Sequence, residues 1–203
     1  MSNKIKKLVI LPLSIMLLAL NITPLFAYTI EIEILGGGYK LRGPEEINFG
    51  NLTATFSEQI STINFRDIEI EATDSTIQEG GLVVIDENGG NEFSVTVSAT
   101  QLTKNGSDCV TNPEDCIPLS NFKISNSDSL PSSEDIETIY GQPNDFSLDG
   151  STNTLQDLST VRTLGNGTGQ APGHWKIFPQ LEITIPAGQK PGDYISTLSF
   201  TIA

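Results

Sequence analysis

The segment from Leu82 to Ala99 reads LVVIDENGGNEFSVTVSA and indicates the fold class most clearly. Its first four residues form a short apolar run, and its last eight residues alternate polar and apolar side chains. A period of two residues is typical of a β-strand with one buried face. The polar segment between the two runs is rich in glycine and asparagine, which favour turns. We therefore expect two strands joined as a β-hairpin.

The rest of the chain shows the same kind of pattern. Apolar residues alternate or cluster in short runs bounded by glycine, proline or polar residues, and no long segment has the period of an amphipathic helix. We expect an all-β protein with a single β-sandwich-like domain. The further strand regions are residues 28–34, 60–72 (with a break near Arg66), 121–124, 175–185 (with a break at Pro179) and 194–202.

The first 27 residues have the pattern of a secretory signal peptide. A basic start with three lysines is followed by an apolar segment, residues 8–20. The alternative is an uncleaved membrane anchor, but this segment is interrupted by Pro12 and is shorter than the roughly 20 residues of a spanning helix. We expect secretion and cleavage after Ala27, which leaves residues 28–203 as one extracellular domain without a transmembrane segment.

The composition is strongly acidic. The chain has 11 basic and 25 acidic residues, and three of the basic residues lie in the leader. The mature domain therefore carries eight basic residues against 25 acidic ones, a net charge of −17. Such a surface repels nucleic acid phosphates and anionic lipids, so we expect neither as a partner.

Two cysteines, Cys109 and Cys116, bracket a segment that contains the turn-forming pair Asn112-Pro113. In an exported protein, this pair predicts a disulfide that closes a small loop. A metal site is disfavoured because the chain has no other cysteine and its one histidine is His174. We expect no cofactor.

Residues 125–173 form a long polar excursion, rich in serine, aspartate, asparagine, glycine and proline. A structureless loop of this length is uncommon in a compact domain, so the segment either holds short irregular elements or carries function at its tip. Within it, oxygen-bearing side chains recur at alternate positions, as at the start of a calcium-binding loop, although the later glycine and glutamate of that loop are missing. A solvated polar loop is the alternative. The calcium candidates are Asp149, Ser151, Asn153 and Asp157.

Five apolar residues are candidates for contact with a ligand or partner. Four of them belong to the motifs Phe93-Ser94-Val95 and Phe200-Thr201-Ile202, in which the outer residues share one face of a strand. That face is either an apolar platform or part of the core, and the alternation favours the core. The fifth, Trp175, follows a glycine-rich segment that we expect to be flexible, and it either stacks on sugar rings or fills the edge of the core. The candidates are Phe93, Val95, Trp175, Phe200 and Ile202.

Several fragments, taken in order, resemble the WxL domain, a family of bacterial cell-surface domains. The resemblance extends over about residues 30–203, with phenylalanine in place of both tryptophans of the family's Trp-x-Leu motifs. The fragments are Ile47-Asn48-Phe49-Gly50, Val83-Val84-Ile85-Asp86, Gly89-Gly90, Phe93-Ser94-Val95, Leu181-Glu182-Ile183-Thr184-Ile185-Pro186-Ala187, Gly192-Asp193-Tyr194 and Phe200-Thr201-Ile202.

The resemblance implies an all-β domain that attaches noncovalently to the Gram-positive cell wall through peptidoglycan. Our first hypothesis is therefore a noncatalytic cell-surface protein that binds a wall glycan or other surface proteins. The second is a structural or adhesin subunit that assembles through edge strands, with Tyr28 and Ala203 marking the two strands concerned. The third is an exported hydrolase, which has no recognisable catalytic motif beyond abundant carboxylates.

Overall fold

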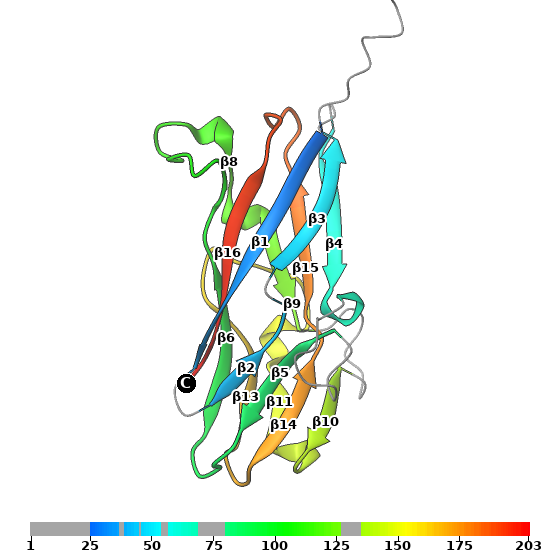
Figure 1. Cartoon of the computed structure of the whole chain (residues 1–203), viewed down its shortest axis with the longest axis vertical. Helices are drawn as coiled ribbons and strands as arrows, with labels where there is room; N and C mark the ends of the chain where they lie inside the picture. Colours follow the sequence, from blue (N-terminus) through cyan, green and yellow to red (C-terminus); the bar gives the residue numbers. More distant parts are fainter. Residues whose placement is uncertain (1–24, 37–38, 45, 54–56, 69–79, 127–134) are drawn as a thin grey trace, which may run out of the picture.

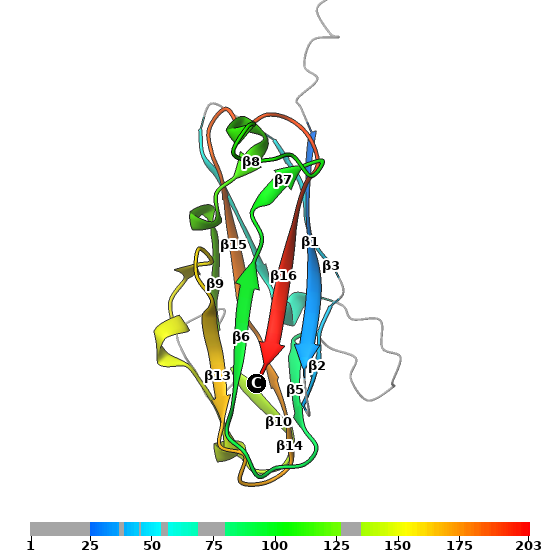
Figure 2. The same ribbon diagram turned by 90° about the vertical axis from the view of Figure 1, so that its left-hand side faces the viewer.

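The chain forms an elongated β-sandwich, shown from two sides in Figures 1 and 2. A computed structural model describes residues 25–36, 39–44, 46–53, 57–68, 80–126 and 135–203. One layer is an eight-stranded sheet, sheet A. The other layer consists of two four-stranded sheets, with sheet B at one end of the molecule and sheet C at the other. The expected all-β fold is confirmed.

Sheet A contains the first and the last strand of the described residues. Its strand order is β11-β13-β6-β16-β1-β3, and β7 and β8 extend it alongside β16. The bounds are β1 Leu25–Gly36, β3 Glu46–Thr53, β6 Phe93–Ala99, β7 Leu102–Lys104, β8 Cys116–Ile117, β11 Phe146–Leu148, β13 Arg162–Gly167 and β16 Tyr194–Ile202.

Sheets B and C are joined by two consecutive strands, β14 and β15, which are separated by the predicted break at Pro179. Sheet B has the order β10-β14-β5-β2, and sheet C has the order β12-β9-β15-β4. The bounds are β2 Lys40–Arg42, β4 Gln59–Asn64, β5 Leu82–Asp86, β9 Phe122–Ser125, β10 Ile136–Tyr140, β12 Gln156–Asp157, β14 Gly173–Ile177 and β15 Gln180–Ile185.

The helices of the described residues are single 3₁₀ turns. They are η1 Phe65–Asp67, η2 Pro113–Asp115, η3 Leu119–Asn121, η4 Pro143–Asp145 and η5 Gly150–Thr152. Within the same ranges, no helix has the length and apolar character needed to cross a membrane.

The two strands that the sequence predicts as a hairpin lie in different sheets. β5 pairs with β2 and β14 in sheet B, whereas β6 pairs with β13 and β16 in sheet A, so the hairpin prediction is wrong. The segment between them crosses from one layer to the other. The Asp86 carboxylate holds this crossing, because its Oδ1 accepts hydrogen bonds from the backbone N–H groups of Asn88 (3.0 Å) and Gly89 (2.8 Å). All five residues of β5 are buried, as expected for a strand covered on both faces.

The two strands expected to offer free edges pair with each other. β1 runs parallel to β16, in register from Tyr28 opposite Tyr194 to Gly36 opposite Ile202. β1 also pairs antiparallel with β3, and β16 also pairs with β6 and β7. Because each strand has neighbours on both sides, the prediction that these two strands serve as assembly edges is wrong for this fold.

Most of the predicted leader, residues 1–24, lies outside the described residues. Its last three residues, Leu25–Ala27, begin β1 and pair with the end of β3. The predicted cleavage point after Ala27 therefore lies inside a strand, and Tyr28 is the first residue of β1 in register with β16.

The described part of the polar excursion holds short elements. β10, β11, β12 and β13 all lie within residues 125–173, together with two 3₁₀ turns. Two of these strands extend sheet A, one extends sheet B and one extends sheet C. The alternative of short irregular elements is therefore the one that the described residues support.

At one end of the sandwich, three aromatic rings each pack against a nearby glycine. The rings of Phe93, Phe146 and Trp175 have centroid separations of 5.6–6.2 Å. A Cβ atom on any of three glycines would overlap one of these rings. The sequence predicts that the glycines before Trp175 are flexible, but they belong largely to the strands β13 and β14. Because they have no side chain, the aromatic rings can lie directly on the backbone. The pairs are Phe93 on Gly167, Phe146 on Gly165 and Trp175 on Gly173.

We expect Gly167→Ala to lower the free energy of unfolding by at least about 1–3 kcal/mol, because the new methyl group would overlap the Phe93 ring. The measurement is urea unfolding followed by tryptophan fluorescence, which reports on the buried Trp175. Gly150→Ala is the matched control, since a Cβ there meets no atom within 4 Å. Equal loss of stability in the two variants would contradict this account of the core.

Candidate functional site

The five apolar contact candidates are all core residues. Each has a relative exposure of 3% or less, and all five belong to one hydrophobic cluster between the layers. A ligand at the surface cannot reach them, so they form no contact platform, and the core, which the alternation favours, is the alternative that holds. The residues are Phe93 and Val95 on β6, Trp175 on β14, and Phe200 and Ile202 on β16.

The two Phe-containing motifs lie side by side in sheet A. Ile202 is opposite Val95, and Phe200 is opposite Val97. Reciprocal backbone hydrogen bonds between Ser94 and Ala203 (2.8 and 3.2 Å) close the end of this pair of strands. Residues far apart in the sequence therefore form one packed unit of the framework.

The side-chain oxygen atoms of three of the four calcium candidates take part in hydrogen bonds of local turns. Asp149 caps η5, and its Oδ1 accepts hydrogen bonds from the hydroxyl and the backbone N–H of Ser151. These bonds, the hydroxyl bond first, hold the pKa of Asp149 below its usual value. Asp157 accepts equivalent bonds from Ser159, and Asn153 ends η5. Over the ranges that the structure describes, no three His, Cys, Asp or Glu residues gather as a metal site.

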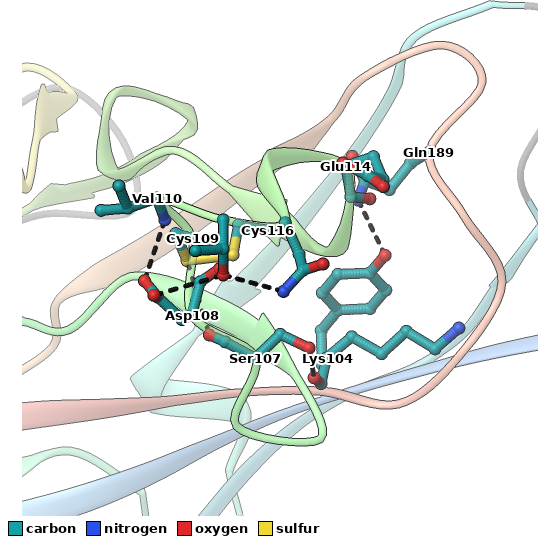
Figure 3. Close-up of a disulfide and its surroundings, with 11 residues drawn as sticks. Lys104, Ser107, Asp108, Cys109, Val110, Glu114, Cys116 and Gln189 are labelled. Carbon is teal, nitrogen blue, oxygen red and sulfur yellow. Dashed lines mark hydrogen bonds between the residues drawn. A yellow bond between two sulfur atoms is a disulfide. The ribbon is translucent and has the colours of Figure 1, made fainter.

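The predicted disulfide between Cys109 and Cys116 is confirmed (Figure 3). It closes a loop that follows β7 and precedes β8, two strands that pair with each other. The Asp108 carboxylate accepts a hydrogen bond from the backbone N–H of Val110 (3.0 Å), and the Val110 side chain is 90% exposed. The bridge thus fixes an exposed, mostly polar loop at the sheet C end of the sandwich.

Ion pairs and hydrogen bonds attach this loop to the turn before β16. Lys190 Nζ lies 3.0 Å from Glu114 Oε1 and 3.2 Å from Asp115 Oδ1. These contacts raise the pKa of Lys190, with the Glu114 bond contributing most. The Gln189 amide donates to the Glu114 carbonyl (2.9 Å) and to the Tyr194 hydroxyl (2.7 Å), which itself donates to the Lys190 carbonyl (2.9 Å).

A shallow groove of about 390 Å³ lies where β6 gives way to β7 along β16. Its hydroxyl groups are largely engaged within the protein. Ser196 Oγ donates to the Thr100 carbonyl (2.5 Å), and Thr100 Oγ1 accepts from the Thr197 backbone N–H (2.8 Å). The groove therefore offers mainly methyl groups and the half-exposed Ile195 side chain.

The outer face of sheet B carries an exposed aromatic residue. Tyr140 is 61% exposed, and its ring contacts the ring of His174 edge to face, with centroids 5.6 Å apart. The register continues from His174 to Ile85 and from Ile85 to Lys40, so one row of side chains crosses all four strands. Directly paired residues point to the same side of a sheet. We define the outer face of sheet B by Lys40, Arg42, Ile85, Glu137, Tyr140, His174 and Lys176.

This face gathers positive charge in an acidic protein. Lys40 Nζ lies 2.6 Å from Glu87 Oε1, and this hydrogen bond is the main reason that the pKa of Glu87 is lowered, with smaller contributions from His174 and Arg42. Nearby, Lys176 pairs with Glu137 (3.4 Å), and Lys176 and Arg66 approach the ring of Phe178. Four of the eight basic residues that follow the predicted leader therefore lie on or beside this face. They are Lys40, Arg42, Arg66 and Lys176.

Sequence reasoning missed Tyr140 because it lies in the polar excursion. The segment Ile136–Tyr140 reads IETIY, a β-prone run that could have identified a strand with an aromatic end. Its position beside His174 depends on pairing between β10 and β14, which no local pattern reveals.

No known protein family matches the chain by its family profile, and no curated protein matches it either. The functional proposals below therefore depend on the residues and on their geometry.

We expect the double variant Cys109→Ser with Cys116→Ser to lose about 2–3 kcal/mol of unfolding free energy, because the short loop gains freedom in the unfolded chain. Thermal and urea unfolding measure the loss, and reduced wild-type protein should show the same decrease. Val110→Ala, in the same loop but exposed, should stay within about 0.5 kcal/mol of the wild type. A double variant as stable as the wild type would contradict a stabilising role for the bridge.

Alkaline pH should weaken the fold through Tyr194. Burial raises the pKa of the Tyr194 hydroxyl above its usual value. The unfolded chain therefore loses this proton first, and the stability that the group contributes is lost as the pH rises above about 10. Tyr194→Phe removes the titration together with the hydrogen bonds to Gln189 and Lys190, which should cost about 1–2 kcal/mol at neutral pH.

The measurement is urea unfolding of wild type and Tyr194→Phe between pH 8 and about pH 11. The difference in unfolding free energy between the two proteins should shrink above about pH 10. A difference that stays constant over this range would show that Tyr194 titrates alike in the folded and unfolded states.

Proposed function

We propose that this protein is an exported, noncatalytic cell-surface protein that associates noncovalently with a bacterial cell wall through its glycan. The observation that carries the proposal is the closed Cys109–Cys116 bridge at one end of a packed sandwich. Disulfides of this structural kind form and persist in oxidising compartments outside the cytosol. The leader pattern of residues 1–27 supports the same location.

The ordered resemblance to the WxL domain supports association with the cell wall. Its fragments occupy β3 at the edge of sheet A and the central strands β5, β6, β15 and β16. The two positions that are tryptophan in the family are Phe93 and Phe200 here, and both are buried in the core. The resemblance therefore concerns the framework, and the binding surface has to be sought among the exposed residues.

The surface properties favour adhesion to a glycan over binding to a polyanion. The net charge of −17 on residues 28–203 repels phosphate-rich polymers. Peptidoglycan strands offer pyranose rings, on which an exposed aromatic side chain can stack, together with carboxylates on their peptides, which cationic side chains can pair with.

The test is retention of the folded, mature protein on purified cell-wall material. We expect the protein to sediment with peptidoglycan sacculi and to be released by soluble peptidoglycan fragments. Sacculi from which secondary wall polymers have been removed should retain it equally well, because the proposed ligand is the glycan. Folded protein that stays in the supernatant at every concentration tested would refute the proposal.

A further inference from the structure

We propose that the outer face of sheet B, around Tyr140 and His174, is the site that binds the wall glycan, and that its ligand is a pyranose chain bearing carboxylates. This inference rests on the proposed function and names the surface that would bind the glycan. The ring of Tyr140 would lie against a sugar ring, and the cations of β2 would pair with the carboxylates of the glycan.

The row of side chains across sheet B has suitable dimensions for such a ligand. Tyr140, His174, Ile85 and Lys40 are paired in register on neighbouring strands. Neighbouring strands lie about 4.8 Å apart, so the row spans about 14 Å from Tyr140 to Lys40. This length accommodates more than one sugar ring, with the exposed Tyr140 at one end and the exposed Lys40 at the other, while Ile85 between them is buried (3% exposed) and makes no contact with the glycan.

Packing of the backbone holds Tyr140 in place. Gly141, which follows it, has a positive φ of 98°, and a Cβ there would come within 2.8 Å of the Gly173 Cα atom. Gly173 in turn packs against the buried Trp175 ring. The Nε1–H group of Trp175 donates a hydrogen bond to the Gln142 carbonyl (3.2 Å). The chain that follows the exposed ring is thus fixed to the core, which lowers the entropy cost of binding.

The charges explain why the ligand should carry carboxylates. Lys40 and Arg42 are exposed on the same face of β2, because the residue between them, Leu41, points into the core. Lys40 already forms an ion pair with Glu87. A carboxylate of the ligand would therefore meet two cations, Lys40 and Arg42, and the existing carboxylate of Glu87. Cation–carboxylate hydrogen bonds are strong and directional for arginine.

The experiment compares variants of the mature protein on two probes, purified peptidoglycan and chitin oligosaccharide, a pyranose chain without carboxylates. Tyr140→Ala should weaken retention on both probes by about tenfold, because both use the ring. Tyr140→Phe keeps the ring and should stay within about twofold of the wild type. Val161→Ala is the matched control, since Val161 is 63% exposed and lies outside sheet B.

Arg42→Gln tests the ligand class. It should weaken retention on peptidoglycan several-fold and leave retention on chitin oligosaccharide unchanged, because only peptidoglycan has carboxylates to pair. Higher salt should reduce the difference between wild type and Arg42→Gln on peptidoglycan. Both substituted side chains are exposed, so the unfolding midpoints should match the wild type, and Arg42→Gln keeps the site testable if Tyr140→Ala does not fold.

The outcomes separate the two proposals. If wild type and Tyr140→Ala are retained equally on peptidoglycan, this site is refuted and the proposed function stands. If Arg42→Gln lowers retention on both probes alike, the carboxylate specificity is refuted. If the wild type itself is not retained, the proposed function fails.

Discussion

The close approach of aromatic rings to backbone is the constraint on which the sheet B end of the molecule depends. Phe93, Phe146 and Trp175 come from strands or turns of both layers, and each ring occupies the space where a glycine lacks a side chain. The glycines therefore let each ring lie close over the backbone of its own sheet. Because Gly173 also lies against Gly141, the same packing fixes the backbone next to the exposed Tyr140. At this end, the packing of the Trp175 ring in the core and the position of the exposed Tyr140 therefore depend on the same glycine, Gly173.

Local patterns in the sequence predict the strands well and their partners poorly. The alternation in β6 and β16 predicts both the strands and the burial of Phe93 and Phe200, since a period of two residues assigns side chains to one face. The turn after Asp86 suggests a hairpin because its composition is that of a hairpin loop. Its six residues instead cross between layers, and the complete burial of β5 is the feature that distinguishes the two cases. Burial on both faces depends on neighbours that are distant in the sequence.

The polar excursion shows the other limit of sequence reasoning. Its strands have two to six residues, too few for a period to stand out from the surrounding serines and aspartates. Short strands of this kind are stabilised by the sheets that they extend rather than by their own composition. The disulfide could be predicted because its two cysteines lie close in the sequence, so that compartment and spacing suffice. Tyr140 could not be placed, because its neighbour His174 comes from β14, which is distant in the sequence.

The parallel pairing of β1 with β16 has a mechanical consequence. The start of β1 and the end of β16 lie toward opposite ends of the long axis, and both strands run in the same direction (Figure 1). Tension that pulls these two ends apart acts along the ladder between Tyr28 and Gly36, so it loads the backbone hydrogen bonds in shear. Bonds loaded in shear share the force and must break together, whereas bonds in a peeled hairpin break one after another. A sandwich held in this way can transmit force along its length while its sheets stay intact.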